Sequence, residues 1–255
     1  LMSTLVQNTI LKRADSIRTM NRTQTNAVLT LGINKTQVTE LFGYHRLDLN
    51  YFNPIKTKLD NPQIKIPLEE RFALYVGRLT KEKNLSQLLQ SWKHVQKIMP
   101  GKHLFIAGEG PQREKLENQV RKLGIEKFVT FLGFVKDELP DLYRSAAMLI
   151  VYSKYESGPW VIPEALACGT PVLSTNVGKA SDWIKNGENG YIANDIDPIS
   201  FGRLIVDAYK EPKLFKPYVS KTCRTMIETV TKKHGLQRYK ELLITTATKK
   251  NQNNS

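Results

Sequence analysis

"FALYVGRLTKEKNLSQLLQSWKHVQKIMPGKHLFIAG", residues 72–108, is the stretch of this chain that decides its fold. It begins and ends with short apolar runs rich in β-branched and aromatic residues, at 72–77 and 103–108, which are typical of buried strands. Between them, apolar residues recur at the spacing of one helix face: Leu85, Leu88, Leu89, Trp92 and Val95. A strand, a helix and a second strand in this order predict two parallel strands joined by a right-handed crossover.

The same alternation continues along the chain. Further strands are predicted at 128–133, 148–153 and 171–175, and helices over about 111–123, 138–146 and 160–168. Strands that alternate with helices form a parallel sheet with helices on both faces. We therefore predict an α/β fold with a Rossmann-like, doubly wound parallel sheet.

Residues 1–60 have a different pattern: a helix end and a strand, then one helix, then another strand and a long irregular connection. One or two such units cannot form a sheet of their own, and the chain begins with Leu1 rather than Met. We interpret residues 1–60 as the partial remnant of a preceding domain with its linker. We expect one large domain over 61–230, and a C-terminal helix with a disordered tail over 231–255.

The formal net charge of +14 is concentrated near the C-terminus. Residues 201–255 carry 12 Lys and Arg against 4 Asp and Glu, whereas residues 61–200 carry 18 against 16. No groove-reading helix or aromatic platform accompanies this charge, which argues against nucleic acid as a partner. The basic segment is interpreted as a solvated helical face or as a surface that attracts anionic lipid; its residues are Lys210, Lys213, Lys216, Lys221, Arg224, Lys232, Lys233, Arg238 and Lys240.

Cysteine content and hydropathy bear on the compartment. Cys168 and Cys223 are the only cysteines, too few for a disulfide framework or a zinc cluster. No apolar run approaches the roughly 20 residues that a membrane span needs. We expect a cytoplasmic protein; attachment to the inner face of the membrane through the basic segment is a further hypothesis.

The loop after the first strand, "VGRLTKEKN" at 76–84, holds Gly77, Arg78 and Lys83. Ligands of open parallel sheets bind at the carboxyl ends of the strands. A flexible Lys and a forked Arg in one such loop suit a diphosphate, whose charge must be neutralised as it leaves. The alternative is two cations that face solvent.

The stretch "YESGPWVIPE" at 155–164 sets two carboxylates, Glu156 and Glu164, around a turn and a helix start. A phosphate beside the start of this helix would meet free N–H groups and the positive end of the helix dipole. Acids next to a phosphate cannot bind the phosphate, so they would accept hydrogen bonds from hydroxyls. The ligand this predicts is a sugar nucleotide, in contact with the residues of the turn: Ser157, Gly158, Pro159, Trp160 and Val161. The alternative is a Glu164 that only favours the helix dipole and a solvated Glu156.

Two other motifs have structural interpretations. "AGEGP" lacks the third glycine of a dinucleotide-binding loop, so Gly108 and Gly110 are expected to allow a tight turn. "DID" at 195–197 resembles a metal-binding pair, but Asp197 precedes Pro198 and an apolar-periodic stretch, which favours a helix N-cap. The four histidines are dispersed, and neither a metal nor another cofactor is expected.

Seven motifs over about residues 70–210 resemble, in order and spacing, the retaining glycosyltransferases of family 4. They are "YVGRLTKEKN", "LFIAGEGPQREKLE", "VTFLGFV", "LYRSAAMLIVYSKYES", the pair Glu156 and Glu164, "EALACGTPVLSTNVG" and "NGENGYI". The resemblance implies a GT-B architecture of two Rossmann-like domains, of which the second holds the nucleotide-sugar donor. It also implies that the sugar keeps its anomeric configuration and that no metal takes part.

Site roles follow from the same resemblance. Arg78 and Lys83 would bind and stabilise the donor diphosphate, Glu156 would contact hydroxyls of the transferred sugar, and Glu164 would accept hydrogen bonds from the ribose. Arg78, Lys83 and Glu156 are therefore the expected catalytic residues, and backbone around Phe134 would meet the base. The sequence departs from the family at Pro159, because many members read E-G-F-G-L where this chain has E-S-G-P-W.

The implied function is transfer of a hexose from a UDP- or GDP-sugar to a glycan or a lipid-linked acceptor. The acceptor-binding part of the preceding domain is missing from this sequence, so we expect the chain to bind donor but not to transfer sugar alone. One alternative is a non-catalytic nucleotide-sugar-binding module that needs a partner for the acceptor half. A sugar-nucleotide epimerase is another, against which the spacing of Glu156 and Glu164 argues.

Overall fold

The structure, a computed structural model, describes residues 9–41, 47–55, 72–211 and 232–253, together with residues 214, 223 and 227. Residues 56–60, at the end of the predicted remnant and linker, lie outside the described residues. Contacts divide the chain into two units, Leu49–Glu228 and a smaller one of Leu1–Asp48 with Thr229–Ser255.

The larger unit is built on a six-stranded parallel sheet, which confirms the predicted fold class. The strand order is β5-β4-β3-β6-β7-β8. Counted from β3 this is the Rossmann order 3-2-1-4-5-6, in which the direction of winding reverses between β3 and β6. The strands are β3 Ala73–Val76, β4 Leu104–Ala107, β5 Val129–Gly133, β6 Met148–Val151, β7 Val172–Thr175 and β8 Gly190–Ala193.

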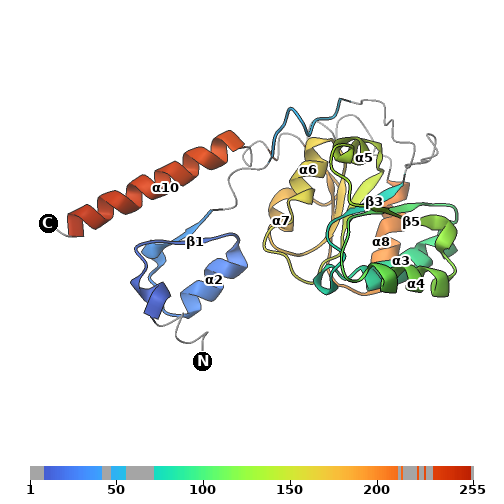
Figure 1. The fold of residues 1–255 in the computed structure, drawn as a ribbon, viewed down its shortest axis with the longest axis horizontal. Helices are drawn as coiled ribbons and strands as arrows, with labels where there is room; N and C mark the ends of the chain where they lie inside the picture. Colours follow the sequence, from blue (N-terminus) through green and yellow to red (C-terminus); the bar gives the residue numbers. More distant parts are fainter. Residues whose placement is uncertain are drawn as a thin grey trace. The chain divides into compact units, whose positions relative to one another are not determined.

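Helices cover both faces of this sheet (Figure 1). One layer contains α3 Leu85–Ile98, α4 Arg113–Leu123 and α8 Pro198–Lys210, and the other contains α5 Leu139–Ser145, α6 Val161–Ala167 and α7 Ala180–Trp183. Helices α3 and α8 approach closely where Gly202 has no side chain: a Cβ atom there would lie only 2.9 Å from the carbonyl oxygen of Ser91.

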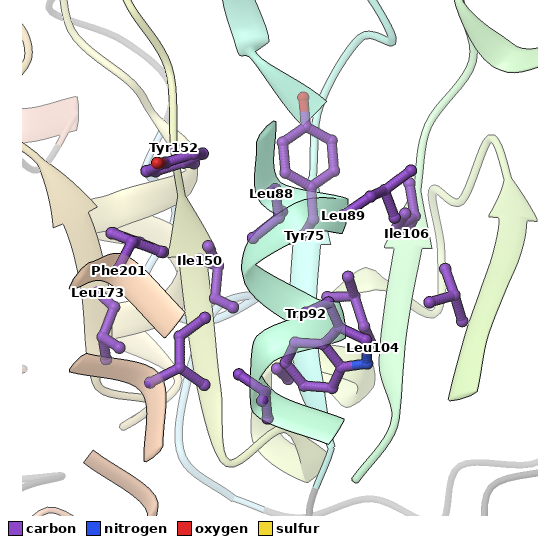
Figure 2. Packing of buried hydrophobic residues seen from close by; sticks show 14 of the residues in the cluster. Tyr75, Leu88, Leu89, Trp92, Leu104, Ile106, Ile150, Tyr152, Leu173 and Phe201 are labelled. Atoms are coloured by element: carbon purple, nitrogen blue, oxygen red, sulfur yellow. The ribbon is translucent and has the colours of Figure 1, made fainter. Parts of the chain in front are cut away.

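The apolar face predicted for residues 85–98 is confirmed as the centre of the core. Figure 2 shows Leu88, Leu89 and Trp92 of α3 above the strands, where all three are fully buried. The indole Nε1 of Trp92 donates a hydrogen bond to the carbonyl of Phe128 at 3.2 Å. Burial of each such side chain stabilises the fold by about 1.5–3 kcal/mol, so α3 is held firmly on the sheet.

Strand β8 and helix α7 were not predicted from the sequence. Strand β8 has four residues, begins at Gly190 and is half-buried along most of its length, so it lacks a strong apolar run. A Cβ atom on Gly190 would lie 1.9 Å from the carbonyl oxygen of Val172, so only glycine allows this close pairing with β7. Helix α7, with four residues, is too short for helical periodicity to show.

The smaller unit contains the predicted succession of strand, helix and strand: β1 Ile17–Thr19, α2 Arg22–Thr30 and β2 Val38–Glu40. Contrary to the expectation that these units cannot form a sheet of their own, the two strands pair in parallel as a two-stranded sheet. The Asn21 side chain caps α2 by accepting from the Gln24 N–H at 2.9 Å. Helix α10, Lys232–Asn253, also belongs to this unit. It includes residues 249–253, part of the end of the chain that was expected to form a disordered tail. Among the residues described, no helix combines the length and apolar character of a membrane span.

Candidate functional site

The carboxyl ends of β3 and β6 lie side by side at the point where the sheet reverses its winding. In open α/β sheets, neighbouring crossovers leave this edge in opposite directions, and ligands bind in the crevice between them. The loops that follow the two strands, residues 77–84 and 152–160, hold most of the predicted site residues.

The loop after β3 is shaped by local contacts. Gly77 has φ +152, and a Cβ atom there would lie 2.9 Å from the Tyr75 hydroxyl. That hydroxyl donates instead to the Arg78 carbonyl at 3.0 Å. A short 3-10 turn, Lys81–Lys83, then ends at Asn84, whose φ of 57 is left-handed. The turn directs Lys83 back over the strand ends.

Lys83 and Glu156 form an ion pair between these two loops. The side chains are 17% and 14% exposed, so the pair is largely removed from water. Ser153 Oγ donates to the same carboxylate oxygen, Glu156 Oε1, at 2.9 Å. The structure thus brings together one predicted cation and one predicted acid, and Ser153 is a contact that the sequence did not indicate.

Backbone contacts tie the surrounding loops to one another. The Lys154 N–H donates to the Glu82 carbonyl at 2.8 Å, which joins the loop after β6 to the loop after β3. Thr175, at the end of β7, donates through Oγ1 to the Ser153 carbonyl at 2.7 Å. Both side chains, Ser153 and Thr175, are buried. The position of Glu156 is therefore fixed from three strand ends.

Arg78 is placed differently from Lys83. Its side chain is 77% exposed, and its Nη2 lies 3.9 Å from Glu82 Oε1. The predicted convergence of Arg78 with Lys83 is not seen as a contact, although both side chains leave the same loop. The ion pair with Glu82 is exposed and contributes little, so breaking it costs little when the guanidinium turns toward a ligand.

The turn after Glu156 leads into α6, as predicted. Pro159 is buried and its carbonyl accepts from the Ile162 N–H at 3.0 Å, while Ser157 and Gly158 are half-buried. Trp160 is the N-cap residue of α6, and Val161 is its first residue. Because Pro159 has no N–H, this turn offers one hydrogen-bond donor fewer than the E-G-F-G-L pattern with which it was compared above.

Glu164 lies in the first turn of α6 and is held from α5. Its Oε2 accepts a hydrogen bond from the Tyr143 hydroxyl at 2.9 Å. Tyr143 is fully buried, and burial raises its pKa well above the ordinary value, so the phenol remains a donor. Sequence reasoning missed this contact because the two residues come from different helices.

Phe134 follows β5 directly and is 76% exposed. Strand β4 separates β5 from β3, so Phe134 is on the same edge of the sheet as the ion pair but two strands away. An exposed ring and backbone at this distance suit the far end of an extended ligand.

Gly178 is a site-shaping residue that sequence reasoning missed. It has φ +56, and a Cβ atom there would lie 2.9 Å from the Glu156 carbonyl oxygen and 3.0 Å from the Gly158 nitrogen. The loop after β7 therefore packs against the backbone of the Glu156 turn. A glycine three residues beyond a predicted strand was the signal available in the sequence.

The two motifs given structural interpretations behave as expected. A Cβ atom on Gly108 would lie 1.9 Å from the Gly77 carbonyl oxygen, and one on Gly110 would lie 2.6 Å from that of Leu79. Asp197 caps α8 by accepting from the Ser200 N–H at 2.8 Å, with Pro198 as the first helical residue. Within the described ranges, no cluster of three His, Cys, Asp or Glu side chains suits a metal ion.

Comparisons with known proteins identify relatives of this chain. The family model "Glycosyl transferases group 1" matches residues 56–232. An uncharacterized glycosyltransferase of Methanocaldococcus jannaschii is 40% identical over 123 residues, which cover 48% of this chain and 31% of that protein. The glycogen synthase of Mycobacterium tuberculosis is 36% identical over 118 residues, which cover 46% and 28%.

Solved structures share the fold. The crystal structure of Anabaena HepE in complex with UDP and glucose matches with a TM-score of 0.81 at 18% identity, over 94% of this chain and 66% of that one. This chain spans about a third of the length of the two relatives named above.

Proposed function

The chain belongs to the group 1 glycosyl transferases, and we propose that its larger unit is the donor-binding part of a retaining, metal-independent enzyme. It would take a hexose from a UDP- or GDP-sugar, and the acceptor would be a glycan or a lipid-linked sugar. Anabaena HepE, which shares the fold, forms a complex with UDP and glucose. UDP is therefore the first ligand to test.

The ion pair of Lys83 and Glu156 is the observation that carries this proposal. It sets a cation and a hydroxyl-accepting acid in contact at the switch point of the sheet, where open α/β sheets bind ligands. Lys83 and the exposed Arg78 would neutralise the departing diphosphate, and Glu156 would accept hydrogen bonds from the sugar. The ribose would reach Glu164, and the base would reach the backbone near Phe134.

The reaction would need no nucleophile from the protein. The bond from the anomeric carbon to the diphosphate oxygen breaks, and the acceptor oxygen forms its new bond on the same face of the sugar. The acceptor hydroxyl gives its proton to the departing diphosphate, so charge and atoms balance. The role of Lys83 and Arg78 is to stabilise the negative charge as it develops.

Calorimetry in the presence of EDTA tests donor binding. UDP and UDP-glucose should bind the chain, and Lys83→Ala should weaken UDP binding at least tenfold because it removes a contact made directly to the charged ligand. Lys97→Ala on α3 is the matched control, since that exposed lysine lies in the last turn of its helix, at the end away from Lys83. No detectable binding of UDP or GDP at millimolar concentration would refute the proposal.

The second candidate is a non-catalytic module that binds the donor for a partner. On this interpretation the site at Lys83 and Glu156 would bind the donor, and another chain would bring the acceptor. Transfer assays with the chain alone and with an added acceptor-side partner distinguish the two functions. Release of free sugar or its transfer by the chain alone would exclude the module.

The basic C-terminal segment would attach the protein to anionic lipid at the cytoplasmic face of a membrane. Helix α10 contains Arg238 and Lys240, and Leu243 and Ile244 on it are exposed. Binding to vesicles that contain phosphatidylglycerol should weaken with added salt and in an Arg238→Glu, Lys240→Glu variant. Binding that is absent or insensitive to salt would dismiss the attachment.

A further inference from the structure

A neutral phenol holds one oxygen of the acid that we assign to the ribose. The hydroxyl of Tyr143 in α5 donates to Oε2 of Glu164 in α6 at 2.9 Å. Tyr143 has no exposed surface, whereas Glu164 is partly exposed. Glu164 is therefore a half-buried residue whose carboxylate is held from the buried side.

Several contacts fix Tyr143 independently of Glu164. The buried hydroxyl of Thr170 donates to the Tyr143 carbonyl at 2.5 Å, which holds the backbone. The ring of Phe52, itself 7% exposed, lies 6.2 Å from the Tyr143 ring centroid. With its ring and backbone both held, Tyr143 offers its hydroxyl from one position.

The segment that contains Phe52 is in turn attached to α5 and to the loop after β5. Arg144 Nη1 donates to the Asn53 carbonyl at 2.9 Å, and the Tyr51 hydroxyl donates to the Lys136 carbonyl at 3.0 Å. Residues 51–53 thus lie as a strap across α5, and they belong to the larger unit. The sequence gives no sign of this, because the strap and α5 are far apart along the chain.

We propose that Tyr143 is the positioning residue of the donor site and that it sets the orientation of the Glu164 carboxylate toward the ribose. This inference rests on the proposed function. A carboxylate fixed at Oε2 presents its other lone pairs in one direction, so the ligand does not have to order it on binding. Without the phenol, the side chain would rotate more freely, and the ribose contact would be weaker.

The test compares UDP with 2′-deoxy-UDP and 3′-deoxy-UDP by calorimetry. The parent chain should prefer UDP over at least one deoxy analogue by about tenfold, the effect of one hydrogen bond to a charged acceptor. Tyr143→Phe keeps the ring and removes the hydroxyl. It should weaken UDP binding about fivefold to tenfold, leave the deoxy analogue unaffected, and so abolish the preference.

Tyr209→Phe is the matched control. It removes another buried tyrosine hydroxyl from α8, one that the described part of the chain gives no hydrogen-bond partner. It should leave both affinities unchanged. In a Glu164→Ala background, Tyr143→Phe should have no further effect on UDP affinity, whereas general damage to the fold would add to the loss.

A failure of the ribose role of Glu164 can be distinguished from a failure of the inference about Tyr143. A parent chain that binds UDP and both deoxy analogues equally would overturn the ribose role of Glu164 and this inference with it. A parent that discriminates while Tyr143→Phe discriminates equally well would overturn the inference alone. If Tyr143→Phe does not fold, Phe52→Leu loosens the ring with the hydroxyl retained, and it should lower the preference twofold to threefold; an unchanged preference would overturn the inference.

Discussion

The ammonium of Lys83 and the carboxylate of Glu156 meet across the reversal point of the sheet, although the two residues are 73 positions apart. The pair has low exposure and shares Glu156 Oε1 with the hydroxyl of Ser153. Each charge compensates the other while no donor is present. A diphosphate that binds here would compete for Lys83 and experience the negative charge of Glu156.

Neutralising Glu156 should therefore separate two effects. In Glu156→Gln, the repulsion between carboxylate and diphosphate is lost and Lys83 is released, so UDP should bind about threefold to tenfold more tightly. The same variant should lose any preference for UDP-glucose over UDP, since the sugar hydroxyls lose their charged acceptor. Calorimetry with both ligands measures the two changes.

Glu117→Gln is the control for this prediction. Glu117 also pairs with a cation, Arg113, but it lies on helix α4 and is 37% exposed. Its neutralisation should leave UDP affinity within a factor of two. Weaker UDP binding by Glu156→Gln would show that the carboxylate supports the phosphate site rather than opposing it.

Gly178→Ala should damage the turn that carries Glu156. The added Cβ atom would approach the Glu156 carbonyl oxygen to 2.9 Å, and φ +56 strains any residue with a side chain. We expect a loss of about 2–4 kcal/mol in the free energy of unfolding, from the strain and the clash together. UDP-glucose binding should also fall at least tenfold. Denaturant titration and calorimetry measure the two effects.

Gly124→Ala is the control for Gly178→Ala, because it introduces the same backbone strain without a steric clash. Gly124 ends α4 with φ +68, and a Cβ atom there would meet nothing within 4 Å. This variant should lose only the roughly 1 kcal/mol of a left-handed alanine and keep its ligand affinity. Equal losses in the two variants would contradict the packing of Gly178 against the Glu156 turn.

Both cysteines should resist alkylation in the folded chain. Burial raises the pKa of the Cys168 thiol to about 12, and the pKa of Cys223 likewise to about 12. At pH 8 only about one thiol in ten thousand is then ionised, against roughly a quarter for an ordinary cysteine. Mass spectrometry after iodoacetamide treatment should find no label at pH 8 in the folded chain and two labels in denaturant.

The same pKa shifts have a defined sign for stability. Because the folded pKa lies above the unfolded value of about 8.5, the folded state keeps protons that the unfolded state releases. The stabilisation of the folded state by the two protonated thiols is complete below about pH 8.5 and is lost as pH rises toward 12. Alkylation of the folded chain by iodoacetamide should become about tenfold faster per pH unit over this range. Rapid alkylation of either cysteine at pH 8 would contradict its burial.

Asp197→Ala should remove the N-cap of α8 and lower Tm by about 2–4 °C. The Ser200 N–H bond lowers the pKa of Asp197, so its stabilising effect is present above the ordinary pKa of 3.8 and disappears as pH falls through the lower folded value. Thermal unfolding at pH 7 and below pH 3 should therefore show a difference only at pH 7.

Asp207→Ala is the control for the cap, since Asp207 is exposed in the middle of the same helix. Its replacement by alanine should leave Tm unchanged or slightly higher. If Asp197 instead held a metal, EDTA would lower Tm in the parent and not in Asp197→Ala. Such a result would favour the metal-binding interpretation of residues 195–197.

The spacing of apolar residues in the sequence predicted the helices and strands that depend on local patterns. The helix with Trp92 and the strands from β3 to β7 have clear apolar signals, and their carboxyl ends placed Lys83 and Glu156 at one edge. What it could not predict depends on contacts between distant segments. The pairing of β8 depends on a missing side chain at Gly190, and the partner of Glu164 comes from another helix.

The glycines of "AGEG" have a practical consequence for chimeric proteins. Gly108 lies against the carbonyl of Gly77, and backbone bonds join Leu79 to Glu109 and Gln112 at 2.9 and 3.0 Å. The loops after β3 and β4 therefore behave as one rigid piece. Anyone who transplants residues 77–84 from a relative should transplant residues 107–112 with them, because a bulkier neighbour would displace the loop that carries Lys83.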